Sequence, residues 1–197
     1  MYLYLIRHGE SEANAENAHA GWAPYGLTEL GRQQAEKTRE LIKDIPFDAL
    51  YVSDVLRAQQ TANIIFGDMP RTYIADCREM NNTTMRGLHW DEMYEKFGEE
   101  YAVCRARFDY APLHIDCEST AHFLRRAKGF MDSIATNDEI RVALVCHAGF
   151  IRACAANALG LSTHNPPLGC RNASVSVLTY RRNEWVLTLW DQTRDMP

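Results

Sequence analysis

The sequence lacks an excess of positive charge and lacks any long hydrophobic run. Its 197 residues include 21 Lys and Arg against 26 Asp and Glu, a formal net charge of −5. Nucleic acids and anionic membranes are bound through basic surfaces, so this balance argues against both as partners. No apolar run approaches the roughly 20 residues of a membrane span, and the run at residues 2–6 is too short for a signal peptide. We therefore expect a cytoplasmic protein.

Disulfide and metal-binding patterns are also missing. The seven histidines show no H-x-x-E-H or mixed Cys/His ligand spacing, so the sequence predicts no metal site. No C-x-x-C pair occurs among the cysteines, which predicts reduced thiols in a cytoplasm rather than a disulfide framework. The six cysteines are Cys77, Cys104, Cys117, Cys146, Cys154 and Cys170.

Strand-like and helix-like segments alternate along the chain, with no repeat and no low-complexity linker. This alternation predicts an α/β fold, a three-layer sandwich whose mostly parallel sheet has an antiparallel edge hairpin at 174–180 and 184–190. The length suits a single domain over residues 1–197. The other strands are expected at 2–6, 47–52, 72–75 and 141–146, and helices at 28–44, 55–66, 119–134 and 149–160.

The most informative segment is Arg7-His8-Gly9-Glu10, which directly follows the apolar run at residues 2–6. An apolar run that ends in a basic pair and a glycine predicts a buried strand leading into a loop. In open α/β sheets, ligands bind outside the carboxyl ends of the strands. An imidazole placed there can act as nucleophile or base, and a guanidinium can bind an oxyanion.

Two later segments repeat this placement. The apolar run at 141–146 ends in His147-Ala148-Gly149, and the run at 47–52 leads into a helix with Arg57 in its first turn. Helix N-termini attract anions through unpaired N–H groups and the helix dipole. Arg7, His8, Arg57 and His147 can therefore converge on one dianion, for which phosphate is the obvious candidate.

In these segments the chain resembles the histidine phosphatase superfamily, in its phosphoglycerate-mutase-like branch. The resemblance covers nearly the whole chain in the expected order and implies a phosphoglycerate-mutase-like fold. Its motifs are R-H-G-E-S at 7–11, Asn14, L-T-E-x-G at 27–31, Gln34-Ala35, L-R-A-x-Q-T-A at 56–62, Glu79, Glu118-Ser119, Arg126, C-H-A-G at 146–149 and Asn172.

The resemblance implies a role for each catalytic candidate. His8 would attack phosphorus in line and form a phosphohistidine, while Arg7, Arg57 and His147 stabilise charge on the equatorial oxygens. Glu79 matches the acid that protonates the leaving group and later activates water. No metal and no cofactor are implied, because the cations of the site replace a metal ion.

Five further residues are candidates for contact with substrate. Gly9 and Asn14 would shape the phosphate-binding loop. Counted from Arg7 without gaps, the hydroxyl of the mutase substrate loop falls on Ala20, which Gly21 follows. Ala148, next to the second histidine, completes the set.

Residues 76–117 differ from the rest of the chain and are expected to form a largely helical insertion that covers the active site. Met85, His89 and Trp90 could line a substrate pocket there, or could pack the insertion onto the sheet. Thr83 and Arg86 replace a glycine and an acid that the family usually has after Glu79, so the assignment of the acid stays open. Glu10 and Glu118 are its rivals.

The motifs predict a phosphomonoesterase that acts on a small phosphorylated metabolite, but other functions remain. A cofactor-dependent phosphoglycerate mutase is one, although Ala20 and the lack of clear counterparts for the mutase Lys and Arg-Arg oppose it; Arg105 and Arg107 lie in the right region. A phosphate-binding module with weakened catalysis is another. Cys146 and Arg152 also satisfy the C-x5-R spacing of cysteine-dependent phosphatases, a hypothesis that leaves Arg7, His8 and Arg57 unexplained.

Overall fold

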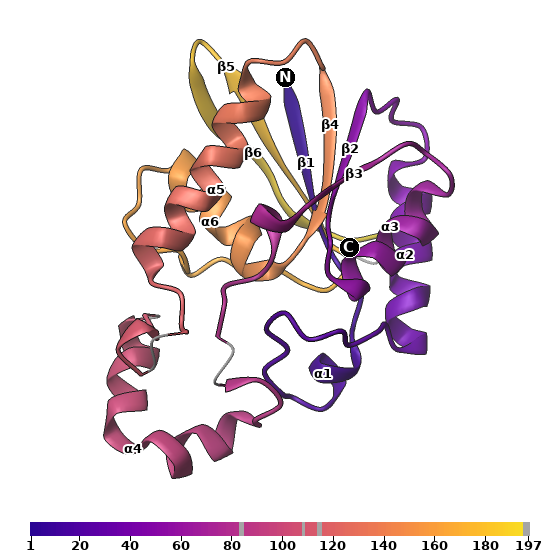
Figure 1. Ribbon diagram of the computed structural model, residues 1–197. Coiled ribbons are helices and arrows are strands. Elements are labelled where there is room, and N and C mark those ends of the chain that lie inside the picture. Colours follow the sequence, from indigo (N-terminus) through magenta and orange to yellow (C-terminus); the bar gives the residue numbers. More distant parts are fainter. Residues whose placement is uncertain (83–84, 108, 114–115, 195–197) are drawn as a thin grey trace.

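The computed structural model describes residues 1–82, 85–107, 109–113 and 116–194, and Figure 1 shows its arrangement. Within these residues one sheet has the strand order β3-β2-β4-β1-β5-β6. The first four strands pair in parallel, and β5 and β6 pair antiparallel, which confirms the predicted α/β fold and its antiparallel edge. The strands are β1 (Tyr2–Arg7), β2 (Ala49–Ser53), β3 (Thr72–Ile74), β4 (Arg141–Cys146), β5 (Val175–Arg181) and β6 (Glu184–Gln192).

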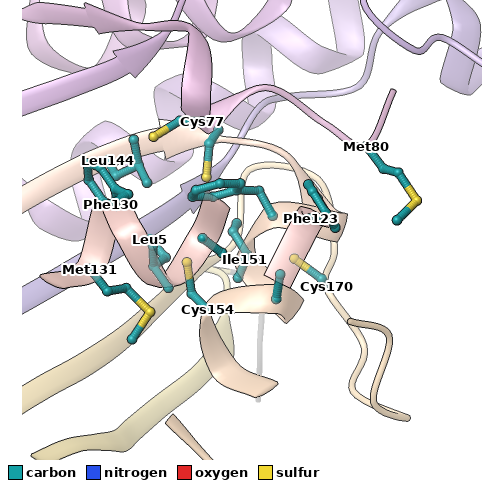
Figure 2. Packing of buried hydrophobic residues seen from close by; sticks show 14 of the residues in the cluster. Leu5, Cys77, Met80, Phe123, Phe130, Met131, Leu144, Ile151, Cys154 and Cys170 are labelled. Atoms are coloured by element: carbon teal, nitrogen blue, oxygen red, sulfur yellow. The ribbon is translucent and has the colours of Figure 1, made fainter. Parts of the chain in front are cut away.

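Helices cover both faces of the sheet (Figure 1). On one face, α2 (Glu29–Ile42) and α3 (Leu56–Phe66) pack through Ala35, Ile42, Ala58 and Ile65 onto alternate strand residues such as Ile6. On the other face lie α5 (Thr120–Ala135) and α6 (Ala148–Ala158). Their side chains pack onto the strand residues that point to this second face of the sheet, such as Leu5 and Leu144 (Figure 2). Because strand side chains alternate, β1, β2, β4 and β5 each contribute side chains to both cores.

The helix ends follow the capping residues that the sequence offers. The Thr28 hydroxyl accepts from Gly31 N, and the Ser119 hydroxyl accepts from His122 N, so both act as N-caps. Helix α3 ends at Gly67, whose φ of 54° lies in the left-handed region that favours glycine. The expected boundaries differ from the observed ones by about two residues, the usual fraying of helix ends.

The segment between β3 and α5 contains η1 (Ala75–Cys77), the long helix α4 (Trp90–Arg107) and η3 (Ala111–Leu113). Gly98 interrupts α4 with a φ of 58°, in the left-handed region. Met85 is fully buried in the core cluster, so it packs the segment onto the domain. Thr83 and the side chains of Trp90 and Arg107, about which the sequence raised expectations, lie outside the described residues.

The topology brings the functional loops to one edge of the sheet. β1 pairs with β4 so that Arg7 stands opposite Cys146, and β4 pairs with β2 on its other side. The residues that follow these three parallel strands therefore leave the sheet side by side. The short helix α1 (Glu12–Ala15) and α4 lie beyond this edge (Figure 1).

No helix in the described part of the chain is long and apolar enough to cross a membrane.

Two glycines allow the loop after β1 to approach α2 closely. A Cβ atom on Gly9 would lie 2.2 Å from the Gly31 carbonyl oxygen, and one on Gly31 would lie 2.0 Å from the Glu10 carbonyl oxygen. Real side chains do not tolerate such distances, and the obstructing atoms are backbone. The backbone around His8 is therefore seated directly against the helix.

This contact predicts opposite effects for two helical glycines. Gly31→Ala should destabilise the protein by about 1–3 kcal/mol, because a methyl group is forced into packed backbone. Gly129→Ala is the matched control, since a Cβ there, in α5, meets nothing within 4 Å. It should stabilise by roughly 0.5–1 kcal/mol through helix propensity. Urea unfolding measures both, and equal stabilities for the two variants would contradict the close packing.

Candidate active site

A cavity of about 680 Å³ opens where the loops after the parallel strands meet the segment that carries α4. It contains three of the four predicted phosphate-binding residues, Arg7, His8 and Arg57, together with Glu79. The other residues that line it are Asn14, Asn17, Ala18, His19, Ala20, Gly21, Met80, Asn82, Asp91, Arg105, Tyr110, Ala148, Gly149, Arg152, His164 and Asn165.

His8 is held as a neutral imidazole whose Nε2 carries the lone pair. Its Nδ1 lies 2.7 Å from the Gly9 carbonyl oxygen, which can only accept, so Nδ1 carries the proton. Nε2 then has the lone pair, and Arg57 Nε donates to it across 3.1 Å. Burial holds the pKa of His8 well below 6.5, and Arg57 and Arg7 lower it further. At neutral pH the ring is therefore an unprotonated nucleophile.

The two arginines are fixed by backbone carbonyls rather than by carboxylates. Arg57, which is 1% exposed, donates through Nη2 to Gly21 O (2.9 Å) and through Nη1 to Ala23 O (3.3 Å). Arg7 donates through Nη1 to Cys170 O (2.6 Å), and its buried Nε has no partner among the described residues. Burial lowers the pKa of Arg57 only to about 10, so it remains a cation. Both keep a charge that a bound dianion can neutralise.

His147 stands behind His8 and does not itself line the cavity. The two rings meet edge to face, with centroids 5.2 Å apart. Nε2 of His147 lies 2.9 Å from the Ser53 hydroxyl, whereas its buried Nδ1 has no partner in the described parts of the chain. Burial, followed by the charge of Arg57, keeps its pKa well below 6.5. At neutral pH the ring of His147 is therefore uncharged.

Glu79 enters the cavity from the segment between η1 and α4. Its Oε1 accepts from Met80 N (2.9 Å) and its Oε2 accepts from Gly149 N (3.0 Å), at the start of α6. A Cβ on Gly149 would lie 2.1 Å from Glu79 Oε1. A side chain at position 149 would therefore displace the Glu79 carboxylate from this position.

The two rival carboxylates lie elsewhere. Glu10 Oε1 accepts from the Thr28 hydroxyl (2.8 Å), at the start of α2. Glu118 forms an ion pair with Arg126 (2.8 Å) and is not among the described residues of the cavity wall. Burial by itself would raise the pKa of Glu118, but hydrogen bonds from Arg126 and from Asn81 N hold it below 4.5. Glu118 therefore stays ionised, whereas a general acid must carry a proton.

The candidates for substrate contact divide into two groups. Asn14, Ala20, Gly21 and Ala148 line the cavity. Gly9 is not among the described lining residues, because its N–H donates to the Thr61 hydroxyl (3.1 Å) and its Cα faces α2. It shapes the loop but offers no donor to a ligand.

Several lining residues were not assigned a role from the sequence. Arg152, one turn into α6, donates through Nε to Leu168 O (2.8 Å) and was considered only as half of a C-x5-R motif. Arg105, Asp91 and Tyr110 come from the segment around α4. Arg105 lies in the region that the sequence offers for a mutase cation, whereas no local signal singles out Asp91 or Tyr110. His89, expected as a possible lining residue, is not among the described residues of the wall.

Cys146 does not have the properties of a nucleophile. It is fully buried at the end of β4, and burial holds the pKa of its thiol well above 9.0. A thiolate is therefore disfavoured, although Arg152 of the same motif lies in the cavity. No group of three or more His, Cys, Asp or Glu residues in the described ranges is arranged to hold a metal ion.

Comparisons with known proteins show which proteins this chain is similar to. The chain is 30% identical over 164 residues to the adenosylcobalamin/alpha-ribazole phosphatase of Salmonella typhi, covering 82% of this chain and 81% of that protein. It is 35% identical over 118 residues to the 2,3-bisphosphoglycerate-dependent phosphoglycerate mutase of Xanthobacter autotrophicus, which covers 56% of this chain and 57% of that protein.

A solved structure has the same fold over almost its entire length. The mycobacterial glucosyl-3-phosphoglycerate phosphatase, in complex with VO3, matches with a TM-score of 0.85 and 26% identity, covering 96% of this chain and 98% of that one. A family model described as histidine phosphatase superfamily (branch 1) matches residues 3–193. The resemblance inferred from the motifs is thereby confirmed, and the chain belongs to the histidine phosphatase superfamily.

Proposed function

We propose that this protein is a metal-independent phosphomonoesterase that acts on a small phosphorylated metabolite through a phosphohistidine on His8. The observation that carries the proposal is the state of His8. A neutral ring with its Nε2 lone pair in the cavity, between the cations Arg7 and Arg57, suits nucleophilic attack on a phosphate ester. A cytoplasmic location is part of the proposal, and the burial of all six free cysteines is compatible with it.

In the first step, His8 Nε2 attacks phosphorus while the bond to the ester oxygen breaks. Charge on the three equatorial oxygens is stabilised by Arg7 and Arg57, whose guanidinium groups are already desolvated and anchored. His147, whose ring lies against that of His8, would donate an Nδ1–H to one oxygen, which leaves its Nε2 to accept from the Ser53 hydroxyl. Fixed donors cost little reorganisation in the transition state, and this is the main catalytic contribution expected in phosphoryl transfer.

Glu79 is the proposed acid and base. As the ester bond breaks it gives a proton to the departing alkoxide, and in the second step it takes a proton from the water that attacks phosphohistidine. Its carboxylate lies in the same cavity as His8, held by two backbone N–H groups. Neither Glu10 nor Glu118 has this placement.

The second candidate function is a phosphoglycerate mutase. Similarity to mutases favours it, as do two further cationic side chains in the cavity wall, Arg105 and Arg152, which could bind a second acidic group. Against it stands Ala20, which lines the cavity at the position counted for the mutase hydroxyl and offers no hydrogen bond. Hydrolysis is therefore the preferred function.

The nucleophile is tested by a pair of substitutions. His8→Ala should abolish turnover, whereas Cys146→Ser, which alters the C-x5-R alternative, should leave turnover nearly intact. Label trapped from a 32P-phosphorylated substrate should be acid-labile, base-stable and mapped to His8. Label on Cys146, or full activity of His8→Ala, would show the assignment to be wrong. EDTA in every assay tests independence from metal.

Hydrolase and mutase are separated by product analysis. With isotopically labelled 3-phosphoglycerate, the protein should release phosphate and form little 2-phosphoglycerate, even when 2,3-bisphosphoglycerate is supplied. A mutase must retain its dephosphorylated intermediate long enough to phosphorylate it again, and Ala20 provides no hydroxyl for that. Dominant isomerisation would favour the mutase, and phosphate binding without either product would favour a binding module.

The role of Glu79 is tested with two kinds of leaving group. An alkoxide needs a proton to depart, but p-nitrophenolate leaves unaided, so Glu79→Gln should slow transfer from alkyl phosphates to His8 by roughly 10²–10⁴-fold and from p-nitrophenyl phosphate far less. Glu10→Gln, an equal change outside the cavity, is the control. Single-turnover rates measure both. Equal losses on both substrates for Glu79→Gln, or a larger alkyl-selective loss for Glu10→Gln, would remove Glu79 from the role.

A further inference from the structure

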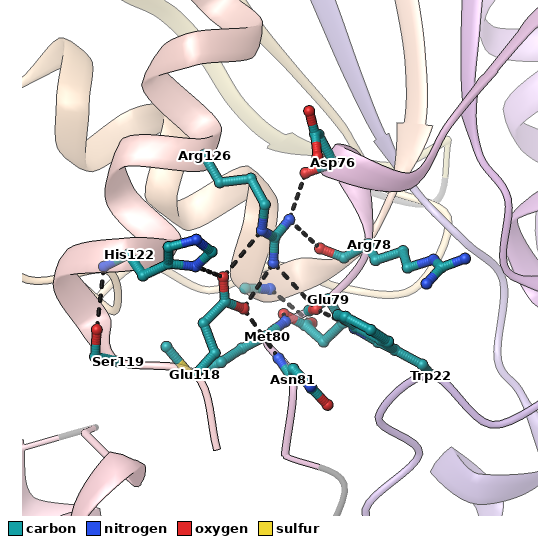
Figure 3. A network of polar contacts seen from close by, with 11 residues as sticks. Trp22, Asp76, Arg78, Glu79, Met80, Asn81, Glu118, Ser119, His122 and Arg126 are labelled. Carbon is teal, nitrogen blue, oxygen red and sulfur yellow. Dashed lines mark hydrogen bonds and ion pairs between the residues drawn. The ribbon is translucent and has the colours of Figure 1, made fainter. Parts of the chain in front are cut away.

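Arg126, on α5, reaches the segment that carries Glu79 without entering the cavity (Figure 3). Its Nη1 donates to the carbonyl oxygens of Asp76 and Arg78, the latter at 2.9 Å. Its Nη2 donates to the carbonyl oxygen of Glu79 at 3.3 Å. A single guanidinium therefore binds three backbone carbonyl oxygens within residues 76–79, and the last of them belongs to Glu79.

The remaining donors of Arg126 are used by Glu118. Nε donates to Oε1 (3.0 Å) and Nη2 to Oε2 (2.8 Å), a bidentate pair. A guanidinium has five N–H groups, and here all five have acceptors. The side chains of Arg126 and Glu118 are only 10% and 6% exposed, so this pairing is shielded from water. With all of its N–H groups bonded, the Arg126 guanidinium has one preferred position.

Glu118 in turn holds the chain on the far side of Glu79. Its Oε2 accepts from Asn81 N at 3.0 Å, and its own N–H donates to Asn81 O at 2.7 Å. Trp22 adds a bond from Nε1 to the Glu79 carbonyl oxygen at 2.8 Å. The backbone is thus bonded on both sides of Glu79, which limits where its carboxylate can lie.

The Arg126 guanidinium also packs against two aromatic rings of the domain. Its central carbon lies 4.7 Å from the ring centroid of Phe123 and 5.7 Å from that of Phe150, on α5 and α6. α6 begins next to His147 and carries Gly149, whose N–H binds the Glu79 carboxylate. The same two helices therefore locate the backbone of Glu79 through Arg126 and its carboxylate through Gly149.

We propose that Arg126, locked by Glu118, is a positioning residue that sets the Glu79 carboxylate against the leaving-group oxygen. The inference rests on the proposed acid role of Glu79. Arg126 is not among the described residues that line the cavity, so its effect on catalysis is expected to pass through Glu79. A displacement of about 1 Å can cost a catalytic group roughly 100-fold, so loss of these bonds weakens proton donation even while the fold persists.

The proposal predicts a leaving-group signature for Arg126→Gln. His8 phosphorylation by an alkyl phosphate should slow roughly 10- to 100-fold, and phosphorylation by p-nitrophenyl phosphate should change little. In the double variant Arg126→Gln/Glu79→Gln, the alkyl rate should equal that of Glu79→Gln alone, because both changes remove one function. Arg125→Gln is the matched control, since Arg125 is the preceding, exposed residue of α5; it should behave as the parent protein.

Single-turnover rates on both substrates decide the outcome, with thermal unfolding to confirm the fold. If Arg126→Gln does not fold, Arg126→Lys, which keeps the charge but has fewer donors, is judged by the same rate ratio. Equal loss on both substrates, or additive losses in the double variant, would reduce Arg126 to a structural role and overturn the proposal. Absence of an alkyl-selective loss in Glu79→Gln alone would instead overturn the acid assignment, and the positioning role with it.

Discussion

The parallel pairing of β1 with β4 is the constraint on which the rest of the site depends. Arg7 stands opposite Cys146, and the ladder continues one step further because His8 N donates to Cys146 O at 3.0 Å. The two histidines that follow the strands therefore emerge as neighbours. Since strand side chains alternate between faces, a slip of one residue in either strand would direct the histidines apart. The apolar cores on both faces prevent that slip, so packing far from the cavity preserves its geometry.

A second constraint is the burial of positive charge. Two guanidiniums and two imidazoles occupy a region from which water is largely excluded, and burial lowers the pKa of all four groups. The imidazoles respond by remaining neutral, which makes His8 reactive. The guanidiniums remain charged, and backbone carbonyls at Gly21, Ala23 and Cys170 satisfy only part of their donors. The proposed phosphate dianion would supply the missing acceptors and the opposite charge, so burial of these cations costs the free protein stability that such a ligand would restore.

The proposed acid, Glu79, is positioned differently from the proposed phosphate-binding residues. Arg7, His8 and Arg57 follow directly from strand ends and a helix start, whereas Glu79 stands in an irregular segment. Its backbone is held by side chains from α5 and from the loop before it, and its carboxylate by Gly149 at the start of α6 (Figure 3). The segment around α4 then closes the cavity with Arg105, Asp91 and Tyr110. The proposed phosphate-binding residues and the residues around α4 therefore reach one cavity from different parts of the fold, which suits a superfamily that contains both phosphatases and mutases.

The sequence by itself determined the α/β class, the antiparallel edge, the strand-end placement of Arg7, His8 and His147 and the place of Arg57 in the first turn of a helix. These features depend on local periodicity and on the residues next to it. Only the tertiary structure decided which nitrogen of His8 is free, that Cys146 is buried as a thiol, and that Gly9 packs against Gly31 rather than facing the cavity. It also decided that Arg126 and Glu118 hold the segment of Glu79, and that Arg105 and Arg152 line the cavity. These features depend on contacts between segments distant in the chain, whose burial, register and hydrogen-bond partners exist only once the two cores have packed.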